Sequence, residues 1–136
     1  MGQRHFLAAV KDLAESYSEF NAYWNYLYKL YSGKEDDSSI KVRSALIAMR
    51  SSFLVCVEGL SRLNSLMKNR QPYSSILPEA ILYSSNAKTQ VNIISNEYHS
   101  IKKLLGTETD TTEKIFGQMG EAIELIKIKL ASLGSA

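Results

Sequence analysis

The chain has 136 residues, of which 45% are hydrophobic and 22% are charged, and its formal net charge at pH 7 is +2. These values are those of one ordinary globular domain, so they exclude whole-chain disorder, and we expect residues 1–136 to form a single helical-bundle domain. A net charge this small does not by itself indicate a nucleic-acid partner. The single cysteine, Cys56, excludes an internal disulfide and a cysteine-rich metal site.

Four segments share one hydrophobic period. Residues 6–31 place a large apolar or aromatic residue at alternating steps of four and three, the 3.5-residue seam of a helix that packs along its neighbours. The same alternation recurs over residues 42–67, 80–105 and 116–133, more weakly where the third segment starts. A β-strand would need a period of two. The first seam consists of Phe6, Val10, Leu13, Tyr17, Phe20, Trp24, Leu27 and Tyr31.

Turn-forming residues separate the four segments. Gly33 suits the left-handed position after a helix, and the aspartates and serines that follow it offer N-caps. Pro72 prevents simple continuation of the second helix, and a cap at or near Ser75 would place Pro78 in the first turn of the third. The tract 106–112 predicts the last turn. Four rods with short connections predict an all-α fold, an antiparallel up-down-up-down four-helix bundle.

Three glycines fall inside the predicted helices. Gly59 lies in the second segment, and Gly117 and Gly120 lie near the start of the fourth. Glycine lowers helix stability relative to alanine, so each position needs a reason. We expect all three to allow close packing against a neighbouring helix, in preference to forming a hinge.

The predicted helices carry no constellation of catalytic or metal-binding residues. His5 and His99 are too few for a histidine-rich centre, and the seams contain no carboxylate of the kind that metal-binding bundles use. Cys56 lies on a core seam, where a thiol is a poor nucleophile. We therefore expect no enzymatic activity, no catalytic or metal-binding residue, no cofactor and no small-molecule substrate. The alternative is an internal apolar pocket, lined by Tyr17, Trp24, Cys56 and Tyr98, but core filling explains these residues more simply.

The sequence also bears on location. No apolar run approaches the roughly 18 residues that a membrane-spanning helix requires. Charged residues return early, at Lys11 and Asp12, which is not typical of a signal peptide. We expect no membrane association and a cytoplasmic location.

Large apolar and aromatic side chains remain on the helix faces that point away from the seams. Contiguous apolar patches mark interfaces, and tyrosine and arginine are enriched at interface cores. The sequence therefore predicts a non-enzymatic assembly or interaction protein, a subunit of a homo-oligomer or of a larger complex, although apolar residues scattered singly would carry no such meaning. The predicted partner interface consists of Tyr23, Tyr26, Leu30, Ile47, Leu54, Leu125 and Ile128.

The second segment is strongly basic. Residues 41–70 contain six basic residues and one acidic residue, a net charge of +5, whereas the rest of the chain carries −3. This asymmetry supports an alternative function, a nucleic-acid-binding accessory protein that contacts phosphates through this helix. The simpler interpretation is a solvated face that acids on adjacent helices partly neutralise. The predicted contacts are Lys41, Arg43, Arg50, Arg62, Lys68 and Arg70.

Overall fold

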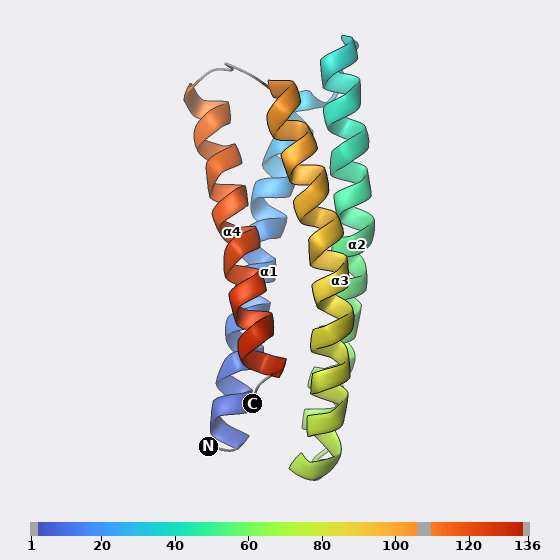
Figure 1. Cartoon of the computed structure of the whole chain (residues 1–136), viewed down its shortest axis with the longest axis vertical. Coiled ribbons are helices and arrows are strands. Elements are labelled where there is room, and N and C mark those ends of the chain that lie inside the picture. Colours follow the sequence, from blue (N-terminus) through green and yellow to red (C-terminus); the bar gives the residue numbers. More distant parts are fainter. Residues whose placement is uncertain (1–2, 106–109, 135–136) are drawn as a thin grey trace.

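The computed structural model describes residues 3–105 and 110–134 of the chain and places them in four α-helices (Figure 1). The helices are α1 (Gln3–Tyr31), α2 (Asp37–Lys68), α3 (Tyr73–Leu105) and α4 (Asp110–Gly134). The described residues form no β-strand, so the predicted all-α four-helix bundle is confirmed. Most of the predicted third turn, residues 106–109, lies outside the described residues.

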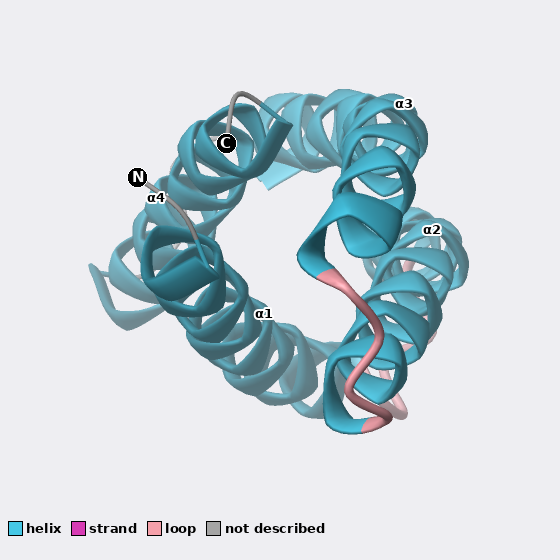
Figure 2. Cartoon of the chain, turned by 90° about the horizontal axis from the view of Figure 1, so that it is seen from below, coloured by secondary structure: helices cyan, strands magenta, loops and turns pink. Residues whose placement is uncertain are grey.

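The helices run alternately up and down and pack as neighbours around a closed ring (Figures 1 and 2). Packed pairs are α1 with α2, α2 with α3, α3 with α4, and α4 with α1. Consequently α2 and α4 lie diagonally across the bundle. The α2–α3 contact is the most extensive of the four and the α1–α2 contact the least extensive, which leaves the α1–α2 side more open.

The core consists of the four predicted seams. Every seam residue whose side chain the structure describes is buried, apart from Met67, which is half-buried near the end of α2. Two aromatic donors that enter the core have backbone acceptors there, as buried donors require. Trp24 Nε1 donates to the Leu46 carbonyl at 2.6 Å and thereby ties α1 to α2. Tyr98 donates to the Phe116 carbonyl at 2.9 Å and ties α3 to α4.

Local sequence explains the α1–α2 connection. Gly33 has a φ of 81°, so it occupies the left-handed position that the sequence predicts at the end of α1. Asp36 caps α2: its Oδ2 accepts from the Ser39 backbone N–H at 3.1 Å and its Oδ1 accepts from the Ser39 hydroxyl at 2.7 Å. These hydrogen bonds hold the pKa of the Asp36 carboxyl below its usual value.

The start of α3 differs from the sequence prediction. The helix begins at Tyr73, directly after Pro72, whose carbonyl accepts from the backbone N–H groups of Ser75 and Ile76. Ser75 therefore lies inside the helix and does not cap it. Pro78 is correspondingly in the second turn, not the first as predicted, where it removes one donor of the helical hydrogen-bond ladder. Pro72 lies directly before the first helical residue, where its missing N–H interrupts no helical hydrogen bond.

The three helical glycines have different surroundings. A methyl group on Gly59 would meet the Tyr83 ring of α3, with Cε1 only 2.5 Å away, and a methyl group on Gly120 would meet the Tyr98 ring, with Cζ at 2.8 Å. Close packing is therefore confirmed at Gly59 and Gly120. It is wrong at Gly117, because nothing lies within 4 Å of a methyl group built there. Gly117 faces open space on the outside of α4.

Candidate interaction surfaces

A cluster of two tyrosines and a cysteine at the centre of the bundle is the most chemically distinctive group in the interior. Tyr83 donates to the Cys56 carbonyl at 2.7 Å, so the 2.6 Å bond between the hydroxyls of Tyr17 and Tyr83 has Tyr17 as its donor. Burial raises the pKa of both tyrosines and raises the pKa of the Cys56 thiol to about 11. At neutral pH all three groups are protonated, which favours a structural role and disfavours nucleophilic chemistry.

The four residues of the alternative internal pocket do not line one common cavity. Tyr17, Cys56 and Tyr98 border three different surface grooves, between α1 and α2, α2 and α3, and α3 and α4 respectively. Trp24 stacks on Tyr28 with ring centroids 5.0 Å apart. Core packing therefore accounts for all four. Within residues 3–105 and 110–134, no group of three or more His, Cys, Asp or Glu side chains is placed to hold a metal ion.

Four of the residues assigned to the partner interface are clearly exposed. Ile47 and Leu54 of α2 retain 53% and 43% of their maximal exposure, and Leu125 and Ile128 of α4 retain 41% and 63%. Tyr26 of α1 is also exposed. These side chains stay outside after the core of the protomer is complete, so their burial would have to come from another molecule.

The remaining two predicted interface residues are only partly exposed to solvent. Tyr23 and Leu30 of α1 are half-buried and pack against the core of their own chain. The structure therefore separates them from the fully outward residues.

Two arginines of the basic helix have contacts within the chain. Arg43 donates from Nη1 to the Tyr31 carbonyl at 2.7 Å and also to the Lys34 carbonyl, so it caps the end of α1. The guanidinium of Arg50 lies over the Trp24 ring, 4.7 Å from the centroid. Both side chains are half-buried. The other predicted phosphate contacts are exposed: Lys41, Arg62, Lys68 and Arg70.

The structure adds exposed apolar residues that the sequence analysis did not single out. Ile40 lies seven residues before Ile47 and fourteen before Leu54, and all three are exposed on α2. That spacing repeats one helical face, so it could have revealed Ile40. On α3 the exposed residues Leu82, Ile93 and Leu104 are spaced eleven apart, which is three helical turns. Others are Leu7, Val55 and Ile81.

A hollow on the outer surface between α3 and α4 adjoins the exposed pair of α4. Its α4 side includes Gly117, Gly120, Leu125 and Ile128, and its α3 side includes Tyr98, His99 and Lys102. Two carboxylates of α4 also border it, Glu121 and Glu124.

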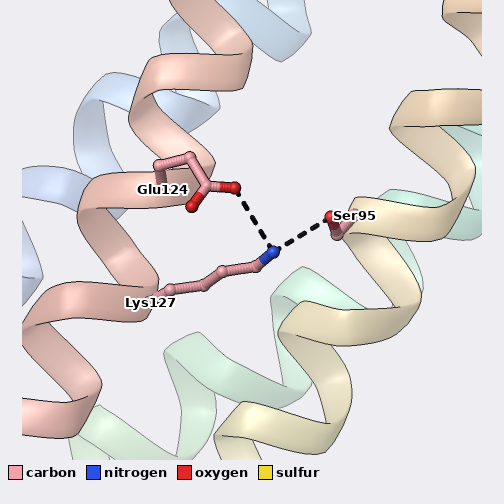
Figure 3. A network of polar contacts seen from close by, with 3 residues as sticks. All are labelled: Ser95, Glu124 and Lys127. Carbon is pink, nitrogen blue, oxygen red and sulfur yellow. Dashed lines mark hydrogen bonds and ion pairs between the residues drawn. The ribbon is translucent and has the colours of Figure 1, made fainter.

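One polar bridge crosses from α4 to α3 beside this hollow (Figure 3). Lys127 Nζ donates to the Ser95 hydroxyl at 3.1 Å and pairs with Glu124 Oε1 at 3.3 Å. This is the one ion pair among the residues that the structure describes. Glu121 and Glu124 are both exposed near Leu125 and Ile128. Burial, and after it the Glu121 charge, raises the pKa of Tyr98.

In the described part of the chain, no helix combines the length and the apolarity that crossing a bilayer requires. Comparison with protein-family models, with curated proteins and with solved structures gives no match for this chain. Function must therefore be inferred from the chain's own surfaces, which include exposed apolar residues on α2 and α4.

Proposed function

We propose that this protein is a non-enzymatic assembly subunit, which acts in a homo-oligomer or in a larger protein complex. The observation that supports this proposal is the exposure of Ile47, Leu54, Leu125 and Ile128, each more than two-fifths exposed, on two helices whose inner faces already complete the core. Burying a large aliphatic side chain contributes about 1.5–3 kcal/mol, so four such residues represent a substantial unsatisfied interaction. Interfaces between subunits supply that burial most commonly in symmetric homo-oligomers.

The test is the molar mass in solution, measured by light scattering over at least a hundredfold range of protein concentration. We expect a mass above that of the protomer, which falls on dilution. A variant with glutamine at all four positions should be monomeric and remain helical by circular dichroism. A second variant replaces Leu82 and Ile93, which are comparably exposed on α3, with glutamine. It should keep the wild-type mass, and a lower mass would place the contact on α3 instead of α2 and α4. A wild-type chain that is monomeric at every concentration would overturn the proposal.

Nucleic-acid binding is the second candidate, and the exposure of Lys41, Arg62, Lys68 and Arg70 supports it. These four are the fully exposed members of the six predicted contacts, because Arg43 and Arg50 lie against α1 and keep only part of their surface in solvent. Electrophoretic mobility shifts on single- and double-stranded probes test it. Binding should weaken steeply as salt rises, since phosphate contacts release counterions. A complete absence of a shift at low salt would exclude this function.

A further inference from the structure

The exposed apolar residues of α2 form an ordered stripe with basic residues between them. Ile40, Ile47 and Leu54 repeat every seven residues along one face, and Arg43 and Arg50 fall between them at steps of three and four. We call these five residues the α2 stripe. Between residues 38 and 68 of the chain the one acidic residue is Glu58, so the stripe carries positive charge without a carboxylate inside it.

The two arginines of the α2 stripe are held in place. Arg43 is fixed by the carbonyls of Tyr31 and Lys34, and Arg50 is fixed over the Trp24 ring. Neither carbonyl nor ring cancels the positive charge, and both side chains keep part of their surface in solvent. A long side chain that is already ordered loses less conformational entropy when a partner binds. The α2 stripe is therefore a preorganised surface as well as a basic one.

The outer side of α4 offers the opposite combination. Glu121, Leu125 and Ile128 are exposed there, and we call these three residues the α4 face. The α4 face borders the hollow at Gly117 and Gly120, with Glu124 at its rim. Lys102 of α3 and Lys127 of α4 also lie nearby, and Lys127 is paired with Glu124. Apolar side chains beside a recess and an exposed carboxylate suit a partner that presents large aliphatic residues and arginines.

Gly117 points to the same conclusion independently. A glycine in the middle of a helix is destabilising relative to alanine, and close contact within the protomer explains it at Gly59 and Gly120. Nothing within the protomer occupies the space over Gly117. A side chain of a second molecule that packed against the backbone of α4 at Gly117 would explain why this position is a glycine.

The two surfaces lie on opposite sides of the molecule, because α2 and α4 are diagonal in the ring (Figure 2). Pairing of the α2 stripe with itself would bring the arginines of one copy next to those of the other, whereas pairing of the α4 face with itself would give those arginines no carboxylate to contact. Like charges placed opposite each other disfavour an interface. Pairing of the α2 stripe with the α4 face brings the arginines of one copy next to Glu121 of the other. It also places the aliphatic side chains of the stripe at the hollow between α3 and α4.

We infer that copies of this chain associate head to tail, with the α2 stripe of one copy docked on the α4 face and the adjoining hollow of the next. This inference rests on the proposed assembly function and specifies its partner as a second copy. A heterologous contact of this kind leaves one free surface at each end of a dimer, so it continues into a ring or an open filament. The assembly therefore grows beyond a dimer as concentration rises.

The test uses two complementary variants of the full chain. One carries Ile47→Gln and Leu54→Gln on α2, and the other carries Leu125→Gln and Ile128→Gln on α4. Each variant alone should be monomeric, because each has lost one of the two surfaces that every contact needs. An equimolar mixture should form a dimer of twice the monomer mass that does not grow further, since only one productive pairing remains. Light scattering of each variant and of the mixture measures this.

Other results would overturn the inference in recognisable ways. If the α4 variant keeps the wild-type mass while the α2 variant is monomeric, the contact is α2 with α2 and the head-to-tail arrangement is wrong, although assembly itself stands. If the reverse holds, the contact is α4 with α4. If the mixture stays monomeric while the wild-type chain assembles, the two surfaces do not meet. A wild-type chain that is monomeric throughout removes the assembly function itself.

A further variant examines the hollow. A Cβ at Gly117 meets no atom within 4 Å, so Gly117→Met should extend into the open space over α4 without impairing folding. We expect the apparent dissociation constant of the wild-type assembly to rise at least tenfold, while the thermal midpoint in dilute solution, where the chain is monomeric, is not lowered. Unchanged assembly by Gly117→Met would show that the hollow is not part of the contact.

Discussion

The structural role of a glycine inside a helix depends on which side chains lie next to it. Gly59, Gly117 and Gly120 are the same residue in the same secondary structure, yet two of them accommodate a tyrosine ring and the third accommodates nothing within the protomer. Sequence reasoning assigned close packing to all three. It was wrong at Gly117, because helical periodicity gives the direction of a residue and not whether a neighbour reaches it.

The three glycines predict opposite responses to alanine. Gly117→Ala should stabilise the isolated protomer by about 1 kcal/mol, since alanine has the higher helix propensity and the space is open. Gly59→Ala and Gly120→Ala should destabilise it by about 1–3 kcal/mol, because the tyrosine rings of α3 must move. Chemical denaturation at a concentration where the chain is monomeric measures all three. A gain in stability from Gly120→Ala would contradict the described contact with Tyr98.

The two hydroxyls of the central cluster are not equivalent. Tyr83→Phe removes the donor to the Cys56 carbonyl and also the acceptor for the buried Tyr17 hydroxyl, so two hydrogen bonds are lost at once. We expect a loss of about 2–3 kcal/mol. Tyr17→Phe removes one donor and leaves the Tyr83–Cys56 bond intact, so it should be milder, at about 1 kcal/mol. Equal losses for the two variants in denaturant titrations would show that the hydroxyls do not form a directed chain.

At the scale of elements, the seams were the most predictable feature. Alternating steps of four and three placed the inner face of each helix correctly from Phe6 to Leu133, because core burial imposes that period on any helix that packs along its neighbours. Helix starts were less predictable. Pro72 and Ser75 are both acceptable near a helix start, and sequence reasoning chose the wrong one, which also misplaced Pro78.

The end of α1 depends on a residue of α2. The Arg43 guanidinium donates to the carbonyls of Tyr31 and Lys34, so it adds a side-chain donor at the end of α1, where the Tyr31 carbonyl also accepts from the Lys34 backbone N–H at 3.4 Å. Arg43→Ala should lower the free energy of unfolding by about 1–2 kcal/mol and speed amide hydrogen exchange in the α1–α2 connection. Arg62→Ala, at an exposed arginine of the same helix, is the matched control and should change stability by less than about 0.5 kcal/mol. If both variants behave alike, Arg43 does not act as a cap.

At the scale of the whole molecule, alkaline pH should unfold the bundle. In the unfolded chain a cysteine titrates at 9.0 and a tyrosine at 10.0, whereas burial raises the pKa of Cys56 to about 11 and raises the pKa of Tyr17 and Tyr83 further. Because the folded state holds these protons more tightly, their stabilising effect is complete below about pH 9 and is lost as the pH rises above it.

The expected signature is a free energy of unfolding that is level near neutral pH and declines above about pH 9. Cys56→Ala provides the comparison, since it should flatten the part of the decline between about pH 9 and pH 11 and leave the tyrosine contribution at higher pH. Denaturant titrations across this range measure both profiles. Identical profiles for the two proteins would mean that the thiol does not stay protonated in the folded state.

The sequence by itself determined the helix number, the inner face of each helix and most of the outward apolar residues, because a period of 3.5 residues is a local property that survives in any bundle. It also indicated which large side chains the core leaves outside, including Ile47, Leu54, Leu125 and Ile128. Only the tertiary structure decided what lies next to what. It showed that Arg43 and Arg50 contact α1, that Tyr23 and Leu30 serve their own core, and that Gly117 is left open. These are contacts between helices. They depend on the distance between neighbouring helices and on the relative position of the helices along the bundle axis. The hydrophobic period of one helix carries no information about either quantity.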